Sequence, residues 1–176
     1  MNNTRSGYLL GIGSNINPDD NIARIIELLL KSFSTINLSR ILRCPPVRIN
    51  SNGDFLNAVA FIRTSITELE LKNICNNIET KLGRNRNSPA RKIRDRTADL
   101  DILATVAFPD DKFRFPASIT DEYFLYPLIY ELFAFLSGYE YKLEQSGVSI
   151  DINGLLFGQT ATTIHRDTGT GNKGVR

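Results

Sequence analysis

The order in which strand-like and helix-like segments alternate constrains the fold of this chain more than any other feature. An apolar run at 8–13 precedes an amphipathic helical pattern, and two further apolar runs follow at 36–44 and 55–63. A second helical pattern then leads to a final run at 99–103. Two helices among four strands in this order are typical of the split βαβ, ferredoxin-like arrangement. We therefore predict an α+β fold with a βαββαβ core, an antiparallel sheet with its helices on one face, and a C-terminal extension.

The two helical segments carry recognisable start and stop signals. Asn17 before Pro18 predicts an N-cap followed by proline at the first helical position. Thr67 with Glu70 three residues later matches a capping box. Gly83 stands where a glycine usually ends a helix. Apolar residues recur at helical spacing in both segments, which predicts one buried face on each helix.

The rest of the chain predicts an extension of this core. The length of 176 residues suits one domain, and no linker interrupts residues 1–165, so we predict a single domain over that range. The aromatic and aliphatic segment 123–136 predicts one or two short helices, and 148–152 predicts a short strand. Residues 166–176 are rich in glycine and polar residues, which predicts a disordered tail.

Charge and cysteine usage argue against several protein classes. The formal net charge is only +2, and the basic residues gather between Arg84 and Arg96, which indicates a local anionic ligand and no nucleic-acid partner. Cys44 and Cys75 have neither metal-ligand nor redox-motif spacing, as expected of a reduced cytosolic protein. Residues 1–7 lack the apolar segment of a signal peptide, and no apolar run reaches transmembrane length. We predict a cytoplasmic, soluble protein without a membrane partner.

The segment from Gly83 to Leu103 carries the clearest chemical signal. Its first half is rich in arginine, and its second half is an apolar strand interrupted by Asp99 and Asp101. Strand residues two positions apart point to the same face, roughly 6–7 Å from each other, so the two carboxylates project together. Mg²⁺ takes ligands from one or two carboxylates plus substrate phosphates, and guanidiniums bind phosphate oxygens in a bidentate fork. This pattern indicates a metal and polyphosphate site.

A less specific interpretation stays open for the same residues. A basic run is usually a solvated face or a nucleic-acid patch, and two alternate aspartates can simply face solvent. Like charges repel, however, so an apolar strand has little reason to place both on one face without a cation. Asn57, within the strand at 55–63, is similarly open: its amide bonds neighbouring backbone or meets the edge of a heterocyclic ligand. Gly11 and Gly13 allow a backbone or ligand to come close.

Six blocks of this sequence, in order and with similar spacing, resemble the 6-hydroxymethyl-7,8-dihydropterin pyrophosphokinases. The blocks are Tyr8–Asn15, Cys44–Pro46, Phe55–Ala58, Ile78–Glu79, Gly83–Arg86 and Arg96–Ile102. The resemblance extends from about residue 8 to about residue 130, and its most specific block reads R-T-x-D-L-D-I. It implies a ferredoxin-like core and an ATP- and Mg²⁺-dependent diphosphotransferase of folate biosynthesis. Such an enzyme transfers diphosphate from ATP to the hydroxymethyl group of a reduced pterin and releases AMP.

The resemblance also implies a role for individual residues. Arg84 and Arg96 would be catalytic and stabilise charge on the transferring group, while Asp99 and Asp101 would bind two Mg²⁺ ions. The residues implied for the pterin are Pro45, Val47, Phe55, Asn57 and Tyr123. Those implied for the nucleotide are Asn76, Glu79, Arg86 and Ile102. The expected partners are the pterin and ATP, and the expected state is a monomer or weak homodimer.

The chain departs from the family on the nucleotide side. The Trp-Gly-Pro that usually precedes the family's Arg-Thr is replaced by 93–95, and a common lysine is Asn87 here. The family's Pro-His becomes Pro-Ala at Ala117, and acidic Asp121 and Glu122 stand where an arginine follows in the family. Lost phosphate ligands lower affinity for ATP, since each charge-assisted hydrogen bond is worth roughly 1.5–3 kcal/mol.

Three functions of different classes follow. The first is a working pyrophosphokinase, favoured by the retained carboxylate pair. The second is a pterin-binding or regulatory protein with weakened or lost transfer, favoured by Ala117, Asp121 and Glu122. The third is an RNA-binding domain that uses the arginine-rich loop, although the sequence lacks the exposed aromatic platform on which such sheets stack bases.

Overall fold

The main sheet has the strand order of a ferredoxin-like core. The computed structural model of the protein describes residues 4–47, 51, 53–84 and 95–166. The strands of the main sheet are β1 (Arg5–Ser14), β2 (Thr35–Leu38), β3 (Leu42–Cys44), β4 (Phe55–Arg63), β5 (Asp99–Phe108) and β8 (Thr162–His165). They lie in the order β5-β1-β4-β2-β8, with β3 beside β4, and every pairing is antiparallel. The predicted α+β core is confirmed.

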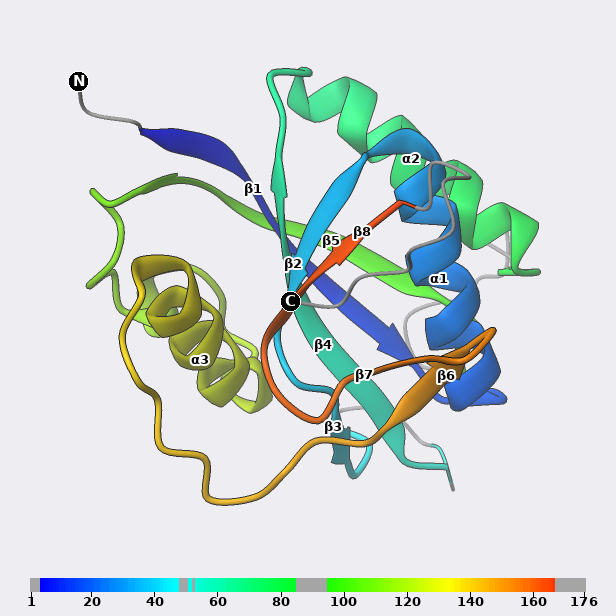
Figure 1. Ribbon diagram of the computed structural model, residues 1–176. Helices are drawn as coiled ribbons and strands as arrows, with labels where there is room; N and C mark the ends of the chain where they lie inside the picture. The colour runs from blue at the N-terminus through cyan, green and yellow to red at the C-terminus, as the bar shows by residue number, and fades with distance from the viewer. Residues whose placement is uncertain (1–3, 48–50, 52, 85–94, 167–176) are drawn as a thin grey trace.

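Two helices, α1 (Pro18–Ser32) and α2 (Glu68–Lys81), cover one face of this sheet (Figure 1). Alternate residues of the strands, such as Leu10 and Ile12, point toward them and are buried. Ile25 and Leu29 of α1 and Leu71 of α2 fill the same core. The predicted buried stripe on each helix is therefore confirmed, because period-2 strand faces and period-3.6 helix faces meet in one layer.

The opposite face of the sheet is covered by α3 (Tyr126–Ser137), which follows the short 3₁₀ helices η1 (Pro116–Ser118) and η2 (Tyr123–Leu125) (Figure 1). Phe108 packs edge-to-face on Phe61 and Phe133, with ring centroids 5.6 and 5.2 Å apart. The helices predicted within 123–136 are confirmed. The apolar residues beneath α3 leave the end of this face at Gly13 free for a cavity.

The predicted strand 36–44 is wrong as a continuous strand, because it breaks between β2 and β3. Ser39 pairs with Val59 through its own side chain: the Val59 N–H donates to Ser39 Oγ at 2.9 Å, while Ser39 N–H donates to Val59 O. The next amide, Arg40 N–H, donates to the Glu131 carboxylate of α3. A hydroxyl and a carboxylate thus take the place of ladder partners, and the chain bends there.

The helix starts differ in how closely they follow their predictions. At Thr67 both hydrogen bonds of the capping box are present. Asn17 does occupy the N-cap of α1, but it has left-handed backbone angles and its side chain makes no cap bond. Instead, Asn21 Nδ2 donates to Ile16 O at 2.6 Å. Pro18 at the first turn and two acidic residues there still favour the helix start.

The C-terminal extension returns to the sheet after α3. Its hairpin consists of β6 (Ile150–Ile152) and β7 (Leu155–Phe157), of which β6 matches the strand predicted at 148–152. The pairing of β8 with β2 was not predicted. Of the tail predicted to be disordered at 166–176, Arg166 is the one residue within the described ranges, and its N–H donates to Ser34 O at 2.9 Å.

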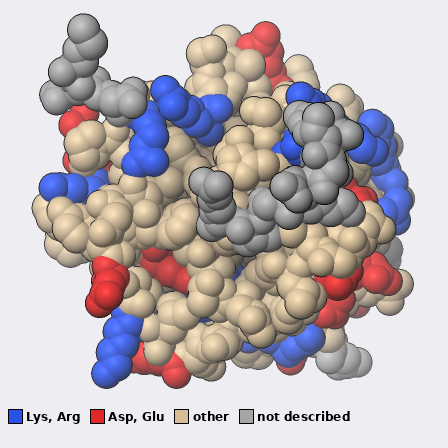
Figure 2. All heavy atoms as spheres, in the orientation of Figure 1, with Lys and Arg blue, Asp and Glu red and all other residues tan. Residues whose placement is uncertain are grey.

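The surface of the described residues carries both signs of charge. On the face drawn in Figure 2, basic and acidic side chains are interspersed, and among the described residues neither sign forms a continuous field. No helix in the described ranges is long and apolar enough to cross a membrane.

Candidate active site

The floor of the candidate site is a row of residues across three strands. Gly13 of β1 pairs with Asn57 of β4 on one side and with Asp99 of β5 on the other, and Gly11 pairs with Asp101. Residues directly opposite in antiparallel strands share a face, so Asn57 and Asp99 flank a glycine. A Cβ at position 13 would lie 3.1 Å from Asn57 Oδ1 and 3.8 Å from Asp99 Cβ. The missing side chain leaves room for a cavity.

This cavity has a volume of about 220 Å³. Pro45 and Val47, which we call the rim, line it, as does the segment 121–125. Phe55 and Tyr123 contribute aromatic surface, and the Tyr123 side chain is 61% exposed. The site can therefore take a flat apolar ring against aromatic faces, with polar groups at its edges.

Asn57 supplies an amide at the edge of the cavity. It is 7% exposed and lines the cavity. Its side chain hydrogen-bonds the Cys44 thiol, and burial is the main reason that the pKa of this thiol is raised. The contact of Asn57 with a heterocyclic ligand stays a prediction.

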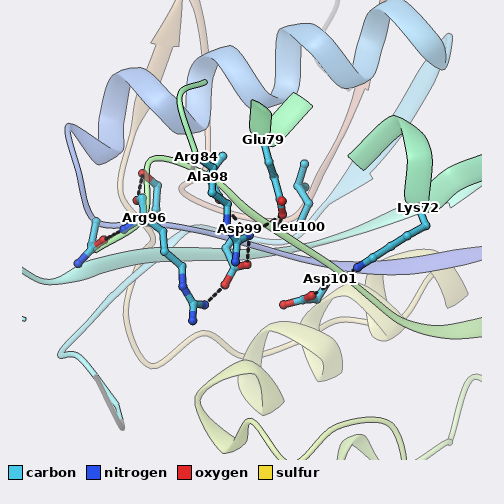
Figure 3. A network of polar contacts seen from close by, with 10 residues as sticks. Lys72, Glu79, Arg84, Arg96, Ala98, Asp99, Leu100 and Asp101 are labelled. Atoms are coloured by element: carbon cyan, nitrogen blue, oxygen red, sulfur yellow. Dashed lines mark hydrogen bonds and ion pairs between the residues drawn. The ribbon is translucent and has the colours of Figure 1, made fainter. Parts of the chain in front are cut away.

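Asp99 is held by two guanidiniums (Figure 3). Arg84 Nη1 donates to Asp99 Oδ1 at 2.5 Å, and Arg96 Nη1 donates to Asp99 Oδ2. Arg84 Nη1 also donates to Oε1 of Glu79 at 2.6 Å, and that oxygen accepts from Leu100 N–H at 2.8 Å. Burial lowers the pKa of Arg84, but the nearby carboxylates of Asp99 and Glu79 raise it by more. The fully buried Glu79 thus positions Arg84, which in turn fixes Asp99.

Arg96 is held at its backbone by Asn15, the residue just after β1. Arg96 N–H donates to Asn15 Oδ1 at 2.7 Å, and Asn15 N–H donates to Arg96 O at 3.0 Å. The other end of the Asn15 amide donates to Asp95 Oδ1 and Ser51 Oγ, at 2.7 and 3.0 Å. Hydrogen bonds from Ser51 and Asn15 lower the pKa of Asp95. This amide therefore joins the end of β1 to the residues that lead into β5.

Asp101 lies on the same face of β5 as Asp99 (Figure 3), as its spacing predicted. It forms an ion pair with Lys72 of α2, whose Nζ lies 3.9 Å from Asp101 Oδ1. Burial and then the charge of Asp99 raise the pKa of Asp101. Burial, Asp101 and Asp99 likewise raise the pKa of Glu122. The carboxylates around this cavity are close enough to repel one another.

The carboxylate pair fits a divalent cation that arrives with a phosphate ligand. Both side chains open into one cavity, and a carboxylate that accepts one hydrogen bond per oxygen retains free lone pairs. Within the described ranges, no three Asp, Glu, His or Cys side chains are arranged to hold a metal by themselves. Mg²⁺ commonly completes its shell with water and substrate phosphates. Asp99 and Asp101 are thus the residues that could hold it.

The structure brings most predicted site residues together and leaves others apart. The residues that line the cavity are Pro45, Val47, Phe55, Asn57, Arg96, Asp99, Asp101 and Tyr123. Arg84 does not line it but reaches Asp99 from behind. Asn76, Glu79 and Ile102 also lie outside the lining, so their nucleotide contacts stay predictions. Arg86, like Asn87, falls outside the described residues.

One residue near the carboxylates, Lys72, was not predicted as a site residue. Lys72 lies on α2 at helical spacing from Asn76 and Glu79, and this polar stripe was the signal that could have identified it. Asp121 and Glu122 also line the cavity. The sequence had already indicated both as departures from the family on the nucleotide side.

Known proteins are similar in sequence to the part of the chain that contains this cavity. The profile of the family described as 7,8-dihydro-6-hydroxymethylpterin-pyrophosphokinase (HPPK) matches residues 9–130. The 2-amino-4-hydroxy-6-hydroxymethyldihydropteridine pyrophosphokinase of Bacillus subtilis (strain 168) is 33% identical over 99 residues, which are 53% of this chain and 56% of that protein. The protein of the same name from Porphyromonas gingivalis (strain ATCC 33277) is 30% identical over 102 residues, 57% of this chain and 69% of the relative. The match thus spans just over half the length of the Bacillus relative.

Proposed function

The chain belongs to the 7,8-dihydro-6-hydroxymethylpterin-pyrophosphokinase family, and from this premise we propose that it transfers diphosphate from ATP to a hydroxymethyl-dihydropterin. The observation that carries the proposal is the shared face of Asp99 and Asp101 in one cavity with Arg96, Asn57 and Tyr123. Carboxylates, a guanidinium, an amide and an aromatic ring are the groups that a metal–polyphosphate and a pterin need at one place. The two relatives carry this activity in their names.

The proposed step is an in-line displacement at phosphorus. The hydroxymethyl oxygen of the pterin forms a bond to the β-phosphorus of ATP. The bond from that phosphorus to the α,β-bridging oxygen breaks, and AMP departs with this oxygen. The hydroxyl loses its proton to solvent. Mg²⁺, when bound, neutralises charge on the phosphate oxygens.

The contribution of the chain to this step is positioning and fixed charge. Arg96 and Arg84 present guanidiniums that are already oriented by Asp99 and Glu79, so little reorganisation accompanies the reaction. Asn15 supports the same arrangement by holding the Arg96 backbone. Such prearranged charges are the main catalytic device in phosphoryl transfer.

The acceptor site is proposed at the other end of the cavity. The Asn57 amide offers a donor and an acceptor to the polar edge of the pterin. Phe55 and the exposed Tyr123 offer ring faces for stacking. Pro45 and Val47 at the rim would exclude water from the ring.

A direct assay tests the proposed transfer. The protein is incubated with ATP, Mg²⁺ and 6-hydroxymethyl-7,8-dihydropterin, and AMP and the pterin diphosphate are measured. We expect product from the wild type and a loss of at least about a hundredfold in Asp99→Ala, comparable to the removal of one electrostatic stabiliser. Asp110→Ala is the matched control, because Asp110 is exposed and does not line the cavity. Undiminished activity in Asp99→Ala would contradict the proposal.

A second candidate function has one observation in its favour. Asp121 and Glu122 line the cavity and bring negative charge to a site proposed for a polyanion. A protein that binds the pterin but has lost transfer would quench or shift pterin fluorescence without forming AMP. Absence of pterin binding, together with RNA binding that falls steeply with salt, would instead support the RNA-binding alternative.

A further inference from the structure

Among the described residues that line the cavity, acidic side chains outnumber basic ones. The acidic ones are Asp99 and Asp101 from β5, and Asp121 and Glu122 from the segment before η2. Within the same described lining, Arg96 contributes a guanidinium. After burial, the negative charges of Asp101 and Asp99 raise the pKa of Glu122. The carboxylates of the two segments therefore repel one another across the cavity.

The two pairs of carboxylates differ in how they are neutralised. Asp99 has ion pairs with Arg84 and Arg96, and Asp101 has Lys72 at 3.9 Å. For Asp121 and Glu122, the described part of the chain provides no ion pair of this kind. Their charge is therefore directed at whatever enters the cavity, and it opposes a free anion there.

We propose that Asp121 and Glu122 act as a charge filter, which admits the phosphate donor as its divalent-metal complex and disfavours the free polyphosphate. The filter would be a specificity determinant and would not bind the donor itself. This inference rests on the proposed function, in which the donor is a nucleoside triphosphate. It assigns a role to two residues that stand where the sequence pattern predicts positive charge.

The expected effect follows from the charges of the two forms of the donor. A unit charge in a partly exposed cavity interacts with another by amounts that change affinity tenfold or more. Free ATP carries more negative charge than its magnesium complex, so the repulsion by Asp121 and Glu122 is larger for the free form. Removing the two charges should therefore improve binding of both forms, and that of the free form by more.

Equilibrium binding tests the filter without any need for turnover. ATP binding is measured by calorimetry in excess MgCl₂ and in EDTA, for the wild type and for the double variant Asp121→Asn/Glu122→Gln, which keeps side-chain size. We expect the variant to bind Mg·ATP about tenfold more tightly and free ATP about a hundredfold more tightly. The double variant Asp110→Asn/Glu140→Gln is the control, since both residues are exposed and outside the cavity lining, and its affinities should match the wild type.

Several outcomes would overturn the filter. Equal or weaker ATP binding by the double variant contradicts it, as does an equal gain in MgCl₂ and in EDTA. A loss of pterin affinity with unchanged ATP affinity would assign the two carboxylates to the pterin instead. Circular dichroism of each variant verifies that it is folded.

The filter and the proposed transfer fail in distinguishable ways. If the wild type forms no AMP but the variant gains ATP affinity as expected, the filter stands and the transfer is wrong. If the wild type forms AMP and the variant gains nothing, the filter alone is wrong. If neither protein binds ATP, both are contradicted.

Discussion

Two carboxylate–guanidinium clusters in this protein use the same chemical groups for different ends. In the buried pair, Arg40 and Glu131, both side chains are 4% exposed and lie 3.7 Å apart. The Glu131 oxygens also accept from backbone N–H groups, from Arg40 at 3.2 Å and from Ala161 at 2.8 Å. In the cavity cluster of Glu79, Arg84, Arg96 and Asp99, the Asp99 carboxylate is held by guanidiniums and lines the cavity.

The difference shows that the partners of a carboxylate, rather than its charge, decide what it can do. The N–H groups that donate to Glu131 belong to the backbone, which the fold fixes in place. Glu131 therefore joins three segments: the bend at 39–41, α3 and the C-terminal extension. Asp99 is held by two guanidiniums and lines the cavity, so the lone pairs that these hydrogen bonds leave free are open to a cation that enters. A buried pair surrounded by backbone is a structural joint, and a pair at a cavity is a binding site.

The joint at Glu131 also secures the C-terminal extension. Ile41 N–H donates to Gly158 O, and Val148 N–H donates to Ile41 O, both at 2.8 Å. The approach is so close that a Cβ at Gly147 would lie 2.0 Å from Gly158 O. This contact sits just before β3, which leads to Pro45 on the cavity rim. The extension therefore braces the chain that forms the rim.

The largest effect that would sharpen this contrast is expected from Glu131→Ala. The change leaves the Arg40 guanidinium buried without its counter-charge and two backbone amides without an acceptor. We expect the free energy of unfolding to fall by about 3–5 kcal/mol, measured by urea denaturation. Asp99→Ala is the comparison, and its loss should be much smaller because that site is partly exposed. Equal losses of unfolding free energy in Glu131→Ala and Asp99→Ala would show that the two clusters do not differ in their structural role.

A smaller effect, on binding, is expected from Gly13→Ala. The new methyl group would lie 3.1 Å from Asn57 Oδ1 and press on the cavity floor. We expect affinity for the dihydropterin, measured by fluorescence, to fall about tenfold. The free energy of unfolding should change by less than about 1 kcal/mol, because alanine is otherwise favoured over glycine in a strand. Ser6→Ala, on an exposed part of β1, is the control. If Gly13→Ala left the pterin affinity unchanged, the cavity floor at Gly13 would not be part of the acceptor site.

The smallest effect concerns the pH dependence of the buried pair. Burial raises the pKa of Glu131, although backbone hydrogen bonds from Arg40 and Ala161 act in the opposite direction. The folded protein therefore binds the proton more tightly than the unfolded chain does. This contribution to stability is fully present below the ordinary value of 4.5 and is lost as the pH rises through the folded pKa.

The matched variant for this test is Glu131→Gln, which does not titrate. Both proteins are unfolded by heat or urea at pH values from below 4.5 upward. The wild type should lose stability relative to the variant as the pH rises. A difference that stays constant, or that grows in favour of the wild type with pH, would show that the Glu131 pKa is not raised.

Much of the fold could be predicted because it is encoded locally. The capping box at Thr67, the apolar periods of α1 and α2 and the β4 run at 55–63 each depend on residues a few positions apart. The break at 39–41 could not be predicted in this way. Its hydrogen-bond partner Glu131 lies 91 positions from Arg40, and nothing in a continuous apolar run announces it.

The candidate site likewise has features that depend on local sequence and features that depend on long-range packing. Asp99 and Asp101 share a face because strand geometry repeats every two residues, so the sequence alone indicated their common direction. The ion pair of Lys72 with Asp101, and the place of Glu122 in the same cavity as both carboxylates, depended on how α2 and the η2 segment pack on the sheet.

The sequence by itself determined the order of the elements, the buried faces and the direction of the carboxylate pair, because each follows from the repeat of a local backbone conformation. Only the tertiary structure decided which charged groups meet. Arg40 meets Glu131 across 91 positions, and Lys72 of α2 meets Asp101 of β5. Long-range neighbours are chosen by chain topology and packing, since no short sequence window contains both members of such a pair.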